Sequence, residues 1–462
     1  MKHTQGAWPM KVSRIRQASR IGLVAALLPL ALASAAQGTL KWQGQQAAAA
    51  TTQPIASRIP ASPQTIPALD VRGFEAVAQQ LVAGGRIPGL AVAIVQNGRV
   101  LSARGYGVTD ARNGEPVDAH TVFRLASLSK SFAGTVTGML VNDGVLRWDS
   151  KVTDFLPDFK LSSPEATKRL TVVDLVSQRS GLGHNAYDPD LEANADFHSL
   201  TRKMAYTPLA CMPGDCYGYQ NVAFSLVGDI AFNASGSFYE QLVERRIFKP
   251  LGMNDASLGL AGIEGSPRWA HPHVRGGRGW VSLAPKPAYY RVAPAAGVNA
   301  SISDMAQWLI AHTGHRPDVL PAPLLATLHA PLISTPGERR AGWRRERISE
   351  ADYAIGWRVF DYAGHRVVFH AGAVQGYRGM IAMIPEEDFG TVILWNSESP
   401  LPSGLLPTIL DRALGLPARK WMDIDTDFGD DTLYVERGKP QESRGVQTAS
   451  GGSPTRSKAS PR

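Results

Sequence analysis

Cysteine is nearly absent from this chain, and its scarcity excludes two kinds of architecture. Only two of the 462 residues are cysteines, Cys211 and Cys216, in the segment CMPGDC. A disulfide-rich scaffold needs several pairs, and two cysteines with no histidine nearby do not make a zinc site. Two interpretations of the pair stay open: a small disulfide ring, which an oxidising compartment favours, or two free thiols.

Acidic residues are missing from residues 1–20 and almost missing from residues 437–462, while both segments are rich in Lys and Arg. Each segment carries a formal charge of +5 and the whole chain carries +8, so the residues between them sum to −2. A nearly neutral central region argues against a basic groove for phosphates. We therefore expect no nucleic-acid partner.

Long apolar runs are also lacking. The candidate IGLVAALLPLALASA, residues 21–35, is shorter than the ~20 residues that a helix needs to span a bilayer. It follows the cationic segment and ends in a small-residue cleavage pattern, and no cysteine follows it as a lipid attachment point. We predict a signal peptide over residues 1–35, no stable membrane span, and a secreted, periplasmic protein.

Large apolar residues concentrate in one region. Residues 36–65 are rich in Ala, Gln, Thr and Pro, which is typical of a linker. Residues 421–462 form a polar tail, basic from residue 437 onward, that we predict to be disordered, because it cannot bury enough apolar surface to fold. We predict one domain over residues 66–420, in which we find no internal repeat.

Strand signals gather at the two ends of this domain. In LAVAIVQNGRVLSARGYG, apolar runs flank Asn97-Gly98, a strong hairpin signal. Near the other end, HRVVFH, GMIAMIP and GTVILWN predict three short strands, at residues 365–370, 379–385 and 390–396. The middle, about 145–340, is mostly helical. We therefore predict an α+β fold, an α/β/α sandwich whose N- and C-terminal strands form one antiparallel sheet flanked by helices, with a helical lobe inserted.

The segment FRLASLSKSFAGTVTGML, residues 123–140, predicts a buried helix that begins near Ser127. Ser127 and Lys130 lie three residues apart and share a helix face, whereas Ser129 and Ser131 point elsewhere. A buried lysine with a lowered pKa can act as the base that activates a serine, and a helix N-terminus can hold an oxyanion. The alternative is a serine cap followed by a lysine that reaches the solvent.

Two further motifs follow in order: Tyr219-Gln220-Asn221 before an apolar helical run, and His370-Ala371-Gly372 at the end of a strand. With Ser-x-x-Lys, they resemble the three ordered motifs of the serine β-lactamases and penicillin-binding proteins, within them the class C-like branch. Framework segments such as IPGLAVAIVQNGRV, IFKPLGMNDASL and YAIGWRV extend this resemblance over about residues 70–415.

The resemblance implies a role for each motif residue. It makes Ser127 the acylated nucleophile, Lys130 its basic partner and Tyr219 the proton relay between nucleophile and leaving group. It also implies a substrate-binding set of Asn221, His370, Gly372 and Ala373. The backbone N–H groups of Ser127 and Ala373 would form the oxyanion hole. No metal or organic cofactor is implied.

The third motif departs from the family pattern, because class C β-lactamases usually have Lys-Thr-Gly where this chain has His-Ala-Gly. His370 is mostly neutral near pH 7, so a permanent charge for a substrate carboxylate is missing. We expect a periplasmic serine hydrolase acting on β-lactams or D-Ala-type peptidoglycan peptides, and thus a small-molecule or peptide partner. The alternatives are an esterase on small acyl esters and a non-catalytic penicillin-binding sensor. The sequence leaves the oligomeric state open.

Overall fold

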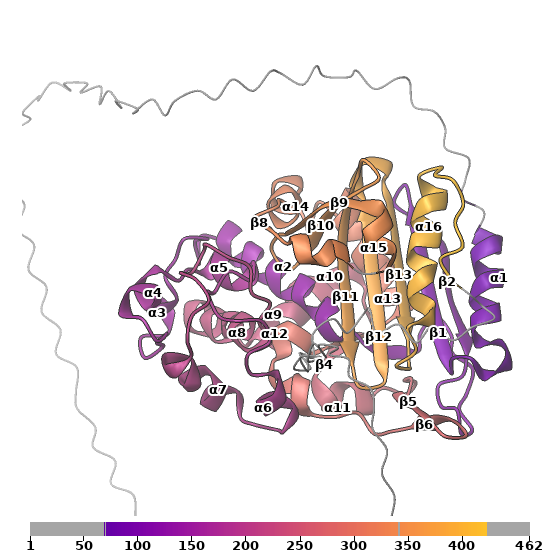
Figure 1. Ribbon diagram of the computed structural model, residues 1–462, viewed down its shortest axis with the longest axis horizontal. Coiled ribbons are helices and arrows are strands. Elements are labelled where there is room, and N and C mark those ends of the chain that lie inside the picture. The colour runs from indigo at the N-terminus through magenta and orange to yellow at the C-terminus, as the bar shows by residue number, and fades with distance from the viewer. Residues whose placement is uncertain (1–68, 70, 341, 423–462) are drawn as a thin grey trace, which may run out of the picture. The chain divides into compact units, whose positions relative to one another are not determined.

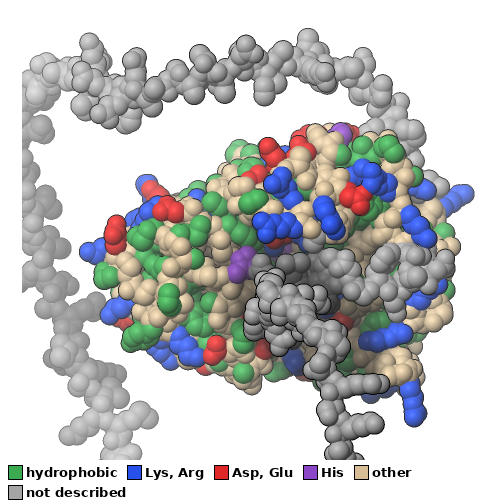
Figure 2. Space-filling model, in the orientation of Figure 1, with side chains coloured by type: hydrophobic (Ala, Val, Ile, Leu, Met, Phe, Trp, Pro, Cys, Tyr) green, Lys and Arg blue, Asp and Glu red, His purple; other side chains and the backbone are tan. Residues whose placement is uncertain are grey.

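A computed structural model describes residues 69, 71–340 and 342–422 (Figure 1). The predicted signal peptide, the linker and nearly all of the basic tail lie outside these residues. Within the described part, no helix combines the length and the apolarity that crossing a membrane requires. Basic and acidic side chains stand beside one another across the visible face (Figure 2).

An eight-stranded antiparallel sheet forms the centre of the fold, in the order β2-β1-β13-β12-β11-β10-β9-β8. The predicted union of N- and C-terminal strands is confirmed, because β1 pairs directly with β13. The strands are β1 (Gly89–Gln96), β2 (Arg99–Gly107), β8 (Ile333–Ser334), β9 (Ile348–Tyr353), β10 (Arg358–Tyr362), β11 (His365–Val374), β12 (Tyr377–Ile384) and β13 (Phe389–Trp395).

The predicted hairpin joins β1 and β2 at Asn97-Gly98, where both residues have positive φ, 51° and 68°. Asparagine and glycine tolerate this left-handed region, which explains why this dipeptide closes the turn. The three predicted C-terminal strands match β11, β12 and β13, with shifts of one or two residues at the ends of β12 and β13 and a larger difference in β11. β11 continues beyond residue 370 to Val374, because its ladder with β12 runs to the pair Val374–Tyr377.

Two apolar layers cover the sheet. Alternate residues of β1 face opposite layers: Leu90, Val92 and Ile94 join one core, whereas Ala91 and Ala93 join the other. Helices α1 (Val71–Val82) and α16 (Leu405–Ala413) contribute to the first core, and α2 (Ser129–Asn142) and α13 (Ile302–Ile310) to the second (Figure 1). This is the predicted α/β/α sandwich.

The predicted helical lobe lies beside the sheet, with α2 between them (Figure 1). It also contains a small sheet, β3-β7-β4 (Val122–Arg124, Val298–Ser301, Ser257–Leu258), and a hairpin of β5 (His273–Gly276) and β6 (Gly279–Ser282). Its helices are α3 (Val152–Phe155), α4 (Pro164–Arg169), α5 (Val172–Val176), α6 (Asp188–Glu192), α7 (Phe197–Lys203), α8 (Asn221–Ser235), α9 (Tyr239–Val243), α10 (Lys249–Leu251), α11 (Gly259–Glu264) and α12 (Ala293–Ala296). Two more helices, α14 (Ala322–Leu328) and α15 (Gly342–Arg347), precede β8 and β9.

Candidate active site

Ser127 lies in a short 3₁₀ turn, Ala126–Leu128, that leads from β3 into α2. The regular helix therefore begins two residues later than Ser127. Ala126 has φ +49° although it is buried, and a non-glycine residue in this region carries strain that is characteristic of functional sites. Among residues 121–140, Ser127 alone is not fully buried.

The neighbouring serines are occupied by structural hydrogen bonds. The hydroxyl of Ser129 donates to the carbonyl of Ala126 at 2.6 Å, and that of Ser131 donates to the carbonyl of Leu128 at 2.8 Å. Both side chains are completely buried. Of the three serines around the lysine, only Ser127 therefore combines access to solvent with a contact to the amine.

Lys130 is fully buried, so it does not reach the solvent as the alternative interpretation required. Its Nζ lies 3.4 Å from Ser127 Oγ and donates to Asn221 Oδ1 at 2.7 Å and to the carbonyl of Ala295 on α12 at 3.1 Å. Burial lowers the pKa of Lys130 well below its usual value, because the charged form loses its hydration. A neutral amine beside a serine hydroxyl can accept its proton.

Tyr219 completes this group from a distant part of the chain. Lys130 Nζ lies 4.6 Å from the centroid of its ring, and its hydroxyl interacts with Ser127. Burial raises the pKa of Tyr219 above its usual value, while the positive charge of Arg358 and the interaction with Ser127 oppose that rise. The phenol is therefore protonated near neutrality and can pass a proton on.

The backbone around Tyr219 is fixed on both sides. Its N–H donates to His184 Nδ1 at 3.1 Å, and its carbonyl accepts from the N–H of Asn185 at 2.8 Å. The next residue, Gln220, donates its N–H to Gln178 Oε1 at 2.7 Å. Hydrogen bonds thus join the segments 178–185 and 209–220, and they fix the position of the Tyr219 phenol.

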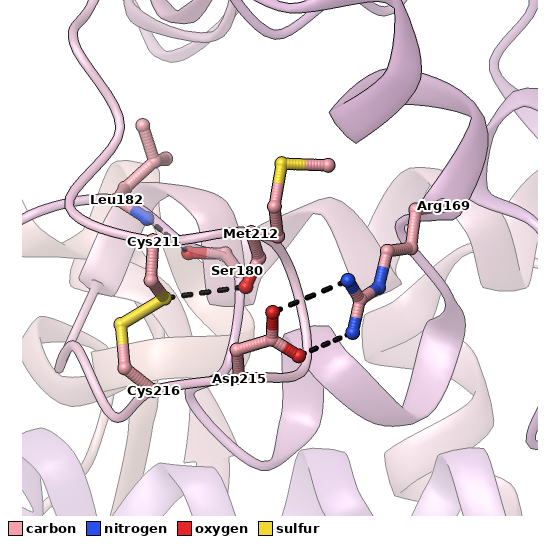
Figure 3. The surroundings of a disulfide bond; sticks show 7 residues. All are labelled: Arg169, Ser180, Leu182, Cys211, Met212, Asp215 and Cys216. Carbon is pink, nitrogen blue, oxygen red and sulfur yellow. Dashed lines mark hydrogen bonds and ion pairs between the residues drawn. A yellow bond between two sulfur atoms is a disulfide. The ribbon is translucent and has the colours of Figure 1, made fainter.

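Cys211 and Cys216 form a disulfide just before Tyr219 (Figure 3). Its ring lies against the chain at Gly181, whose carbonyl accepts from the N–H of Ala210 at 2.8 Å. Gly181 has φ +83°, and a Cβ there would stand 2.5 Å from the carbonyl oxygen of Cys211, so only glycine permits this approach. An ion pair between Asp215, inside the ring, and Arg169 ties the ring to α4.

Asn221 links the lysine to an acid that sequence reasoning missed. As the first residue of α8, it accepts from Lys130 through Oδ1 and donates from Nδ2 to Asp188 Oδ2 at 2.9 Å. Burial raises the pKa of Asp188 to about 6. Asp188 opens the short helix α6, far from any of the three motifs, so no sequence pattern marked it.

The end of β11 passes directly beside the nucleophile. β10 pairs with β11 only as far as Arg358–Phe369, whereas β12 pairs with it to Val374, so residues 370–374 have one free edge. A Cβ on Gly372 would lie 2.4 Å from the carbonyl of Leu125 and 3.1 Å from the backbone nitrogen of Ser127.

Ala373 turns its peptide N–H to that free edge, because residues alternate along an antiparallel ladder and the pair Val374–Tyr377 closes a two-residue turn. The backbone nitrogen of Ser127 approaches the same strand at Gly372. Two peptide N–H groups can therefore converge on a substrate oxygen here.

His370, predicted to line the substrate strand, is buried at the point where β11 loses its pairing with β10. It is 1% exposed, and its Nε2 lies 3.2 Å from the hydroxyl of Tyr353. Burial, together with the positive charges of Arg358 and Lys130, lowers the pKa of His370 well below its usual value. The imidazole is therefore neutral and braces the strand.

The sequence of this chain is similar to those of several known proteins. The chain is 25% identical over 374 residues to unguisins hydrolase ungD of Aspergillus violaceofuscus, which covers 75% of this chain and 65% of that protein. It is 27% identical over 318 residues to protein flp of Staphylococcus aureus, covering 68% of this chain and 61% of that protein. The chain thus spans less than two thirds of the length of these relatives.

Solved structures share the fold. The octameric penicillin-binding protein homologue from Pyrococcus abyssi aligns with a TM-score of 0.67 at 24% identity, over 75% of this chain and 78% of that chain. D-amino acid amidase from Ochrobactrum anthropi SV3 aligns with a TM-score of 0.61 at 21% identity, over 75% of this chain and 98% of that chain. The family model described as Beta-lactamase matches residues 74–415. This chain belongs to the beta-lactamase family.

Proposed function

We propose that this protein is a serine hydrolase that forms an acyl-enzyme at Ser127 and acts on β-lactams or D-Ala-type peptides, as the class C-like resemblance suggests. One observation carries the proposal: the buried Lys130 amine lies 3.4 Å from Ser127 Oγ and donates to Asn221, while Tyr219 interacts with the same serine. A hydroxyl between a neutral amine and a phenol is activated for attack on a carbonyl.

In the acylation step, Ser127 Oγ bonds to the substrate carbonyl carbon and its proton passes to Lys130 Nζ. The carbonyl electron pair moves onto oxygen, where the N–H groups of Ser127 and Ala373 hold the oxyanion. When that pair returns, the carbon–nitrogen bond breaks, and Tyr219 gives its phenolic proton to the leaving nitrogen while it takes the proton from Lys130. The products are an acyl ester on Ser127 and a free amine.

Deacylation repeats these transfers with water. A water molecule gives a proton to the same amine and phenol pair and bonds to the ester carbon. Collapse of the second oxyanion breaks the bond to Ser127 Oγ, which recovers a proton, and the product leaves as a carboxylic acid. Asn221 keeps Lys130 in place through both steps, because its amide is itself held by Asp188.

An esterase on small acyl esters is the second candidate, and a specific observation favours it. His370 is neutral and 1% exposed, so the third motif offers no charge to a substrate carboxylate. Penicillins and D-Ala peptides carry such a carboxylate, whereas simple esters do not. The structure therefore favours uncharged acyl donors more than the family pattern would.

One experiment separates these functions. A fluorescent penicillin, nitrocefin and p-nitrophenyl acetate are each given to the wild type, to Ser127→Ala and to Ser131→Ala as the matched control. Turnover of nitrocefin supports a lactamase, a lasting penicillin adduct without turnover supports a peptidase or a sensor, and ester hydrolysis alone supports the second candidate. Whichever of these reactions the wild type shows should vanish in Ser127→Ala and persist in Ser131→Ala. Reaction that survives Ser127→Ala would refute the proposal.

A periplasmic location is part of this proposal. It is supported by the leader-like segment at residues 1–35 and by the disulfide between Cys211 and Cys216, since such bonds persist in oxidising compartments. Cell fractionation of the expressed chain, with the mass of the mature protein, tests it. Recovery of the uncleaved chain in the cytoplasm would contradict this location.

A further inference from the structure

A buried cation that none of the three motifs contains lies beside the catalytic group. Arg358 is the first residue of β10, and it pairs with Phe369, the neighbour of His370. Its guanidinium carbon is 5.5 Å from the ring centroid of Tyr219 and 5.6 Å from that of Tyr353. Only 13% of its side chain is exposed.

Two partners hold Arg358 in this position. Its Nη1 lies 2.5 Å from Glu338 Oε1 and donates to the hydroxyl of Tyr217 at 3.2 Å. Glu338 also binds Arg344, so one buried carboxylate serves two guanidinium groups. This cluster of Glu338, Arg344 and Arg358 keeps one positive charge in excess, and Arg358 is the member that faces Tyr219.

The charge of Arg358 acts on both proposed proton carriers in the same sense. It lowers the pKa of Tyr219, where it is the strongest influence that opposes burial, and it lowers the pKa of Lys130. It also lowers the pKa of His370, which keeps the imidazole neutral. A positive charge favours a phenolate over a phenol and a neutral amine over an ammonium.

Other ionisable groups surround Tyr219. Asp188 opposes Arg358, because its negative charge raises the pKa of both Tyr219 and Lys130. Apart from Asp188 and the Arg358 cluster, the groups that face the phenol are Lys130 on α2, His184 and Tyr217 in the flanking segments, Tyr353 on β9 and His370 on β11.

We propose that Arg358 is a positioning residue for the acyl transfer: its guanidinium, held beside Tyr219 by Glu338 and Tyr217, favours the proton-accepting forms of Tyr219 and Lys130. The inference rests on the proposed function. It explains how a site with His-Ala-Gly can still carry a cation near the phenol, since Arg358 on the adjacent strand lies beside Tyr219.

The test uses a fluorophosphonate probe, which reports the reactivity of Ser127 without knowledge of the true substrate. Ser127 Oγ bonds to phosphorus, fluoride leaves, and the serine proton passes to the amine and phenol pair. The second-order labelling rate of the full chain is measured from pH 5 to 10, and the midpoint of its rising limb reports the protonation of that pair. If Ser127 is not labelled in the wild type at any pH, the proposed function fails, and this inference fails with it.

Two variants should move the midpoint in opposite directions. Arg358→Gln removes a positive charge, so the midpoint should rise by about one pH unit, and labelling below the midpoint should fall about tenfold. Glu338→Gln removes a negative charge, so the midpoint should fall. Arg358→Lys keeps the charge and should restore most of the wild-type midpoint. A purely structural role would not give shifts of opposite sign.

Arg347→Gln is the matched control, because Arg347 forms an equally buried ion pair with Asp411 on α16, on the side of the sheet away from Ser127. The side chain of Arg347 is 11% exposed. This variant should lower the melting temperature and leave the midpoint unchanged. The inference is overturned if Arg358→Gln, shown to be folded by its melting curve, labels with the wild-type midpoint. If Glu338→Gln does not fold, the comparison of Arg358→Gln with Arg358→Lys decides, and equal midpoints for these two variants overturn the inference.

Discussion

Gly372 offers the sharpest test of how the fold places the nucleophile. The strand β11 passes so close to the 3₁₀ turn that a Cβ at this position would lie 2.4 Å from the carbonyl oxygen of Leu125, 2.8 Å from Leu128 Cδ1 and 3.1 Å from the backbone nitrogen of Ser127. Two of these three atoms belong to the backbone, so rotation of a side chain cannot relieve the contact. Gly372→Ala must therefore move the strand or the turn.

The size of the effect follows from these distances. Ordinary contact begins near 3.4 Å, so the strand and the turn must separate by about 1 Å. Overpacking of this kind costs about 1–3 kcal/mol of unfolding free energy. A displacement of about 1 Å at reacting groups can lower a rate by about 10²-fold, because the N–H groups of Ser127 and Ala373 no longer converge on one oxygen.

Gly379→Ala is the matched control, because Gly379 is the cross-strand partner of Gly372 in the β11–β12 ladder. A Cβ there would first meet Leu394 Cδ2, at 2.9 Å, and a leucine tip can turn away. Denaturant unfolding and the fluorophosphonate labelling rate at Ser127 are measured for both variants. We expect a loss of about 10²-fold in labelling for Gly372→Ala and less than tenfold for Gly379→Ala. Equal labelling rates in the two variants would refute this account of the site.

Three further predictions follow from the site and the core. Lys130→Met should lower the labelling rate of Ser127 by about 10²–10⁴-fold, because no other amine in the described part of the chain contacts the hydroxyl, and a rate near that of the wild type would exclude Lys130 as the base. Replacing Cys211 and Cys216 together by serine should cost about 2 kcal/mol of unfolding free energy, and slower labelling should accompany it if the ring braces Tyr219; unchanged stability and rate would remove that role. The buried pair of His312 and His329, 3.0 Å apart, should make the fold sensitive to acid. Burial lowers the pKa of His329 to about 3 and that of His312 well below 6.5, so the folded state resists protonation that the unfolded chain accepts. Stability should be complete above about pH 6.5 and should fall below it by about 1.4 kcal/mol per pH unit for each histidine, as urea midpoints at pH 7 and 5 would show; a His329→Gln variant with the same slope as the wild type would contradict this.

Local patterns were sufficient to predict the strands β1, β2, β11, β12 and β13 of the sheet. The Asn97-Gly98 turn and the apolar runs of β11, β12 and β13 are signals that neighbouring residues determine. β8, β9 and β10 escaped prediction, and β9 shows why. Its sequence ISEADY mixes buried and exposed positions without strict alternation, so its strand character comes from pairing with β10.

The parts of the site that sequence reasoning missed depend on long-range packing. Arg358 and Glu338 are twenty residues apart in the sequence. No local pattern distinguishes a glutamate on the surface from a glutamate that forms buried ion pairs with two arginines. Asp188 likewise acquires its raised pKa only because the folded chain buries it beside Asn221. The burial of His370 could not be read from its motif either, since accessibility is a property of the assembled strands.

The pairing of β1 with β13 has a consequence for how the chain is made. Leu90 pairs with Trp395, so the middle of the sheet cannot close until the ribosome has synthesised nearly the whole domain. Until then, β1 pairs only with β2 and its second edge stays open, which slows folding because the missing partner lies far along the chain.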